Sequence, residues 1–272
     1  MGESAGAASV HIQAAAASPH KLPFHKVILQ SGTATCPWAT TRATKAGAKT
    51  LAERLAEGLN CSGLEDLRRV DSTDLVKAAL KINGPMGHNL FLPDHTDSIF
   101  FPEGLKGLER PLGVPAIVGI NADEGAFGAA LFLSSKRICQ SLNHPSEFGQ
   151  ALLLGADNAS SAAKAARNEY FLDNEVIGWD SAGKLSRLIS DAFFVHPFFR
   201  LLKATTADGV LQPLFAYKYS HRGEASLPQI MTGVDSFGVS HFDEVLIQFD
   251  NKVNLFREGV PSVLLVYYYY KC

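Results

Sequence analysis

The first residues of the chain carry a pattern that could present a nucleophilic serine. Gly2-Glu3-Ser4-Ala5-Gly6 matches G-x-S-x-G. In this pattern the serine occupies a strained turn between a strand and a helix, and the glycines let the two backbones approach closely. The hydroxyl then projects above the sheet, and the N–H of Ala5 points toward a developing oxyanion. The small-residue segment from Ala5 to Ser18 suits the helix that must follow, while a chance glycine-serine turn is the alternative reading.

A serine hydroxyl is a poor nucleophile until a base removes its proton, and two later positions could supply the missing groups. Asp123 and Glu124 directly follow an apolar run, where an open α/β sheet collects its active-site loops. Position alone does not separate these two carboxylates. His241 comes last, which gives the order serine, acid, histidine. The chain has nine histidines, and His196 and His221 are better interpreted as structural or surface residues.

The elements that must position these groups alternate between strands and helices. Three apolar runs predict strands, and the longest unbroken one is typical of a parallel strand buried on both faces. Strands separated by long helical stretches indicate an α/β architecture. The expected strands are Lys26–Gln30, Pro115–Ile120 and Leu214–Tyr219. The expected helices are Ala5–Ser18, Thr41–Leu59, two within Ser62–Ile82 with a cap at Ser72-Thr73-Asp74, and several from Pro145 to Ala204.

Composition excludes several classes of protein. The chain has 272 residues, 46% hydrophobic and 19% charged, with a formal net charge of -2. This is a globular composition without the basic stripe expected of a nucleic-acid-binding protein. Its longest apolar candidate, Val260–Tyr270, is too short to span a membrane. Four scattered cysteines favour neither a disulfide scaffold nor a zinc site. Two N-glycosylation patterns begin at Asn60 and Asn158, as expected of a secreted protein or by chance.

Several separate blocks in order resemble the type-B carboxylesterases and cholinesterases. They run from Gly2 to about Phe249, nearly the whole chain. The blocks are Gly2–Ser9, Phe24–Gly32, Cys36–Ala39, Gly119–Gly125 and Tyr217–Phe249, the last including Gly238-Val239-Ser240-His241. The resemblance implies an α/β-hydrolase fold, here its central and C-terminal part, with a mostly parallel sheet and flanking helices. It assigns residues 1–259 to a partial carboxylesterase domain and residues 260–272 to a divergent tail.

The resemblance also implies roles for individual residues. It makes Ser4 the nucleophile, Glu124 rather than Asp123 the acid, and His241 the base, with the Ala5 N–H in the oxyanion hole. Ser31 matches an auxiliary serine beneath the triad, with a plain polar strand end as the alternative. Positions that line the family's gorge and acyl pocket match Trp38, Phe91 and Phe127, which could equally be core aromatics. No metal or organic cofactor is expected; the expected partner is a small-molecule ester, and secretion is the expected localisation.

The sequence departs from the family pattern at four places. Only three residues precede Ser4, so neither the strand before the turn nor the upstream oxyanion loop is expected. Phe242 stands where the family usually has a small residue, and Cys61 lacks the partner of a family disulfide. The tail after Val260 has lost the resemblance.

Hydrolysis of carboxylic esters through an acyl-enzyme is therefore the expected parent activity, with low activity of this chain alone. A catalytically inactive adhesion or interaction protein of the same fold is the alternative. The intact set of serine, acid and histidine argues against that alternative. Neither the ester nor the oligomeric state follows from the sequence.

Overall fold

The protein is described from a computed structural model, which divides into two compact units. The first comprises Met1–Pro37 and Leu105–Cys272, and the second comprises Trp38–Gly104. The structure describes residues 1–16, 24–40, 45–83, 104–152, 159–207, 212–223, 226–234, 238–249 and 266–268.

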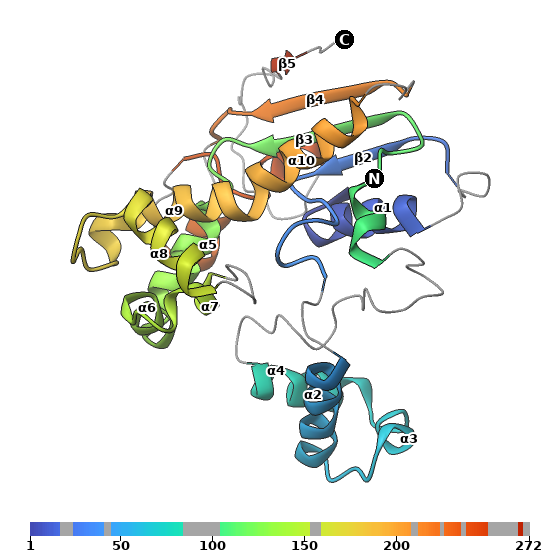
Figure 1. The fold of residues 1–272 in the computed structure, drawn as a ribbon, viewed down its shortest axis with the longest axis vertical. Helices are drawn as coiled ribbons and strands as arrows, with labels where there is room; N and C mark the ends of the chain where they lie inside the picture. The colour runs from blue at the N-terminus through green and yellow to red at the C-terminus, as the bar shows by residue number, and fades with distance from the viewer. Residues whose placement is uncertain are drawn as a thin grey trace. The chain divides into compact units, whose positions relative to one another are not determined.

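The first unit is built on a five-stranded sheet in the order β1-β2-β3-β4-β5. The first four strands run parallel, whereas β5 pairs antiparallel with β4. Figure 1 shows β2, β3 and β4 side by side, with α10 lying across them. The strands are β1 (Gly2–Glu3), β2 (Val27–Gln30), β3 (Ala116–Asn121), β4 (Leu214–Tyr219) and β5 (Val266–Tyr268).

The three predicted strands are confirmed, and β1 corrects one expectation. Gly2 and Glu3 pair in parallel with Leu29 and Gln30, so a two-residue strand does precede Ser4. The sequence could not predict this strand, because two residues are too few for any periodicity. Within the tail that had lost the resemblance, Val266–Tyr268 pairs with β4.

Apolar side chains cover the two faces of the sheet differently. On one face, Ala7 of α1 and Phe198 and Leu201 of α10 pack on alternate residues of β2 and β3. On the other face, Tyr217 and Tyr219 pack with Val239 and with Ile247 of α12. Because both faces are covered, β3 is apolar at almost every position, as the continuous run predicted.

Helices of the first unit fill the connections between strands. The helix predicted from Ala5 is α1, and the helical pattern predicted up to Ala204 is confirmed where it is described. The elements are α1 (Ala5–Ala16), η1 (Gly104–Glu109), α5 (Gly125–Ser134), α6 (Lys136–Asn143), α7 (Phe148–Ala151), α8 (Ala159–Tyr170), η2 (Trp179–Ser181), α9 (Ala182–Ser190), η3 (Asp191–Val195, a π-helical turn), α10 (His196–Thr205), α11 (Leu227–Thr232) and α12 (Asp243–Gln248).

The second unit is a small helical cluster. Its helices are α2 (Lys45–Gly58), α3 (Leu64–Leu67) and α4 (Ser72–Asn83), in agreement with the predicted pattern. Leu55, Leu67 and Ala79 belong to its apolar core. The predicted cap lies one residue too late, because Asp71 accepts the N–H of Thr73 at 2.8 Å. Among all helices that the structure describes, none has both the length and the apolar character needed to cross a bilayer.

Candidate active site

Ser4 lies on a strained turn between β1 and α1. Its backbone φ is 54°, a left-handed conformation that is uncommon for a residue with a side chain. The turn is tight, since a Cβ on Gly2 would lie 2.3 Å from the carbonyl carbon of Gly6. A Cβ on Gly32 would likewise lie 2.3 Å from the Ser4 carbonyl oxygen. The Ser4 N–H donates to the Gln30 carbonyl at 2.8 Å, which ties the strained turn to the end of β2.

Glu124 follows β3 and is almost fully buried, with 1% of its surface exposed. Its Oε1 atom accepts the backbone N–H of Asn121 at 2.7 Å. The next residue, Gly125, begins α5, and a Cβ there would lie 2.0 Å from the Ser186 carbonyl of α9. This close packing of α5 against α9 fixes the backbone that carries the carboxylate.

His241 lies on a turn that is bonded to the end of β3. Asp123 donates its N–H to the Val239 carbonyl at 2.9 Å and accepts the Val239 N–H through Oδ2 at 2.9 Å. After His241, the side chain of Asp243 accepts the N–H of Ser240 at 2.8 Å. Burial raises the pKa of Asp243 to about 6, although its backbone donors oppose this shift. The turn therefore holds the histidine from both sides.

These three elements bring the predicted serine, acid and histidine into one hydrogen-bonded chain. The Oγ atom of Ser4 lies 2.7 Å from Nε2 of His241. The Nδ1 atom of His241 lies 2.7 Å from Oε2 of Glu124. Because an ionised carboxylate can only accept, Nδ1 donates to Glu124, and the unprotonated Nε2 is left to accept the serine proton. Asp123 contacts Val239 instead, so the geometry separates two carboxylates that position alone did not.

Three carboxyl groups, those of the buried Glu124 and Glu244 and the partly buried Glu3, set the electrostatics around the imidazole. Burial would lower the pKa of His241, but the bond to Glu124 and the charges of Glu124, Glu3 and Glu244 raise it above its usual value. Glu3 is a further site residue that the sequence did not single out, and its Oε1 lies 3.2 Å from Nε2 of His241. Burial raises the pKa of Glu3 to about 7, with the other two carboxylates adding to the shift and His241 opposing it.

Two phenylalanines flank the histidine ring. The Phe127 ring on α5 stacks with it at a centroid distance of 6.4 Å. The Phe194 ring, carried by the π-helical turn η3, lies closer, at 4.8 Å. Phe127 was named by the resemblance as an acyl-pocket candidate, whereas nothing in the local sequence pointed to Phe194. A π-helical turn is often found at functional sites, but its position is not visible in the hydrophobic pattern.

The remaining predicted residues lie in different surroundings. Ala5 is the exposed first residue of α1, where backbone N–H groups have no acceptor within the helix. Ser31 is completely buried after β2, and its hydroxyl has no hydrogen-bond partner among the described residues. Trp38 belongs to the second unit, and Phe91 lies outside the described residues.

Phe242, directly after the histidine, also adopts a left-handed conformation with φ 77°. Such a position favours glycine, which accounts physically for the small residue that the resembling family usually has there. The ring is half-buried. Cys61, the residue that resembled half of a disulfide, is a free thiol, as are the other two cysteines that the structure describes.

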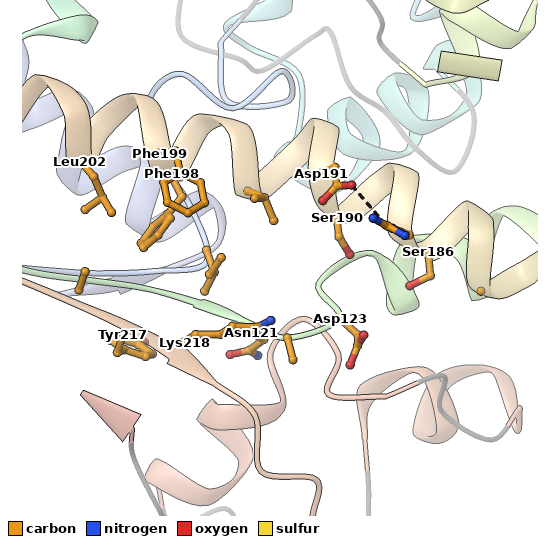
Figure 2. Close-up of a pocket in the computed structure, with 16 residues that line it drawn as sticks. Asn121, Asp123, Ser186, Ser190, Asp191, Phe198, Phe199, Leu202, Tyr217 and Lys218 are labelled. Carbon is orange, nitrogen blue, oxygen red and sulfur yellow. Dashed lines mark ion pairs between the residues drawn. The ribbon is translucent and has the colours of Figure 1, made fainter. Parts of the chain in front are cut away.

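A cavity of about 710 Å³ lies beside the site but does not include its nucleophile. Figure 2 shows it between the ends of β3 and β4 and the helices α9 and α10. Asn121 and Asp123 line it, whereas Ser4 and His241 do not. Over the described parts of the chain, no three histidine, cysteine or acidic side chains gather in a way that could hold a metal ion.

Comparison with known proteins places the chain among the carboxylesterases. The model of the carboxylesterase family matches residues 1–258. Venom carboxylesterase-6 of Apis mellifera is 26% identical over 93% of this chain and 48% of its own length. The cholinesterase of Mus musculus is 30% identical over 64% of this chain and 30% of its own.

Among solved structures, juvenile hormone esterase from Manduca sexta superposes with a TM-score of 0.68 at 19% identity. That match covers 90% of this chain and 48% of the esterase. The fold is therefore a partial α/β-hydrolase fold, as the resemblance implied. The chain spans about half the length of the first curated relatives it matches. With a family model covering nearly all of it, the chain belongs to the carboxylesterase family.

Proposed function

We propose that the protein hydrolyses carboxylic esters, with Ser4 as nucleophile, His241 as general base and acid, and Glu124 as the group that orients the imidazole. The observation that carries the proposal is the hydrogen-bonded chain from Ser4 Oγ through His241 to Glu124, with both contacts at 2.7 Å. A base within this distance of a serine hydroxyl is the arrangement that activates it.

The reaction proceeds in two halves. Ser4 Oγ attacks the ester carbonyl carbon while its proton moves to Nε2 of His241, and Glu124 stabilises the imidazolium. The backbone N–H of Ala5 donates to the oxyanion. The bond to the alcohol oxygen then breaks, and the alcohol leaves with the proton from His241.

In the second half, water attacks the acyl-enzyme. It gives one proton to His241, the bond between Ser4 and the acyl group breaks, and the proton returns to Oγ. The products are one carboxylic acid and one alcohol. Secretion is part of the same proposal, and the name of the Apis mellifera relative as a venom carboxylesterase supports it.

The test is hydrolysis of a 4-nitrophenyl butyrate probe by the purified chain. Ser4→Ala and His241→Ala are each expected to reduce the hydrolysis rate by about a thousandfold or more, because members of a triad act as a unit. Ser9→Ala, a serine on the exposed side of α1, and His144→Ala are the matched controls and keep the rate. Hydrolysis that survives Ser4→Ala, or none by the folded protein, contradicts the proposal.

A further inference from the structure

Asn121 occupies the last position of β3 and bonds both to the acid and to the residue before the histidine. Its backbone N–H donates to Oε1 of Glu124 at 2.7 Å. Its side-chain Nδ2 donates to the carbonyl of Ser240 at 2.7 Å, the residue directly before His241. One residue thus holds the acid through its main chain and the histidine turn through its side chain.

The same Nδ2 atom has a second acceptor, which is a buried carboxyl. It donates to Oε2 of Glu244 at 2.5 Å, and Glu244 has 1% of its surface exposed. Gln30, at the end of β2, donates to the other oxygen of Glu244 at 3.2 Å. Glu244 lies on α12, one turn beyond His241. The contacts of Asn121 therefore join β3 to the turn and the helix on either side of the histidine.

The chemistry of this position requires an amide. Both partners of Nδ2 are oxygen acceptors, and both are buried. Aspartate has the same shape but offers no N–H when ionised, so it would face two acceptors without donating to either. Oε2 of Glu244 would lose the Asn121 donor, and the Ser240 carbonyl would keep only the longer bond from the Asp243 N–H at 3.2 Å. The turn would then be held less tightly and could shift.

We infer that Asn121 is a positioning residue, whose side chain fixes the His241 turn relative to Glu124 and so keeps the imidazole aligned between Ser4 and the acid. This inference rests on the proposed function for its consequence in catalysis. The positioning itself can be observed without catalysis, because the bond from His241 Nδ1 to Glu124 should weaken when the amide is lost.

The test compares Asn121→Asp with Asn143→Asp. Asn143 is a matched control, since its Nδ2 also donates to two oxygen acceptors, in this case the backbone carbonyls of Cys139 and Ile177, away from the site. The first readout is the rate at which a fluorophosphonate probe labels Ser4 as a function of pH. The second is the downfield proton resonance of the His241 Nδ1–H, assigned by its absence in His241→Gln.

Asn121→Asp is expected to slow labelling by about tenfold or more, since small misplacements of reacting groups carry large costs. The same variant adds a negative charge near the imidazole. It should therefore raise the apparent pKa of the acid limb, which is the part of the pH profile where the labelling rate rises as His241 loses its proton. The downfield resonance should be lost. Asn143→Asp should stay within about twofold of the wild type and keep the resonance, because its bonds lie outside the site.

A reversed pair provides the rescue. In the double variant Asn121→Asp with Glu244→Gln, the amide at position 244 can donate to the carboxylate at position 121. One hydrogen bond between the two side chains is restored with donor and acceptor exchanged, and labelling should recover in part. Asn121→Ala removes the donors without adding charge, so labelling should slow without an upward shift of the limb. This variant keeps the inference testable if the aspartate variant does not fold.

Unchanged labelling and an unchanged resonance in folded Asn121→Asp and Asn121→Ala would overturn the inference. Equal losses in the Asn121 and Asn143 variants would also overturn it, since they indicate a general structural role. If the wild type is not labelled, the proposed function fails. The inference then stands or falls on whether the resonance is lost in Asn121→Asp and kept in Asn143→Asp.

Discussion

Glu3 contacts the ring nitrogen of His241 on which the site depends. Oε1 of Glu3 lies 3.2 Å from Nε2 of His241, the atom that also contacts Ser4 Oγ at 2.7 Å. The residue before the nucleophile is thus a neighbour of the base. Burial raises the pKa of Glu3 to about 7, and the charge of Glu3 raises the pKa of His241, so the ionisation of each group affects that of the other.

Glu3→Gln is expected to shift the acid limb of the labelling rate to lower pH. His241 acts as a base only when neutral, and its raised pKa places the limb above the usual histidine range. Removing the Glu3 charge lowers that pKa, so the base becomes available at lower pH. Labelling rates from pH 5 to 9 measure the shift. Glu175→Gln, an acid paired with Lys184, is the control, and an upward shift in Glu3→Gln would refute the electrostatic argument.

Gly2→Ala and Gly6→Ala should change stability in opposite directions, although both alter the same motif. The Cβ at Gly2 meets backbone 2.3 Å away, and such overpacking costs about 1–3 kcal/mol. The Cβ at Gly6 meets no described atom within 4 Å, and alanine is favoured over glycine inside a helix by about 1 kcal/mol. Urea unfolding of both variants measures this difference. A stable Gly2→Ala variant would show that the turn is less tight than described.

Phe242→Gly is expected to be more stable than Phe242→Ala by about 1 kcal/mol, because both remove the ring but only alanine keeps the left-handed strain. The comparison isolates the backbone from the lost packing. At Arg187, on the exposed side of α9, the order should reverse, with alanine the more stable. Thermal unfolding of the four variants measures these two orders of stability. The same order of glycine and alanine at both positions would contradict the strained turn at Phe242.

His11 links α1 to the loop after β2 and should make stability depend on pH. Its Nδ1 accepts the N–H of Ala34 at 3.0 Å, and burial lowers its pKa to about 4. Between about pH 6.5 and pH 4 the unfolded chain therefore binds a proton that the folded chain does not, and stability falls as pH falls.

The contribution is about 2 kcal/mol at pH 5 relative to pH 7.5. The measurement is the change in unfolding free energy between pH 7.5 and pH 5, taken for the wild type and for His11→Gln and then subtracted. His144→Gln, an exposed histidine, should show no such difference from the wild type. A difference between wild type and His11→Gln that does not vary with pH would exclude a buried neutral His11.

Much of the fold could be predicted because its strands are continuous apolar runs. Ala116–Asn121 reads as a buried strand in the sequence and is one in the structure. By contrast α5, which follows Glu124, was not predicted. Its residues are apolar on nearly every side, since it packs in the interior, so it lacks the periodicity of an amphipathic helix.

The site was predictable where chemistry restricts sequence locally, and not where it depends on packing. The G-x-S-x-G pattern singled out Ser4, and the order of motifs singled out His241. The choice between Asp123 and Glu124 needed the resemblance, because two adjacent carboxylates differ mainly in where their side chains point, and the sequence does not give that direction. Asn121 and Glu244 carry no local pattern and acquire their contacts only when β3 and α12 meet.

The most direct test of the account is where a fluorophosphonate probe reacts. Intact-protein mass and peptide mapping of the labelled chain are expected to show a single adduct on Ser4, absent in Ser4→Ala and retained in Ser9→Ala. The hydrogen bond from Ser4 to His241 predicts that result, because only an activated serine reacts with the probe. An adduct on another serine, or no adduct on the folded protein, would contradict the account.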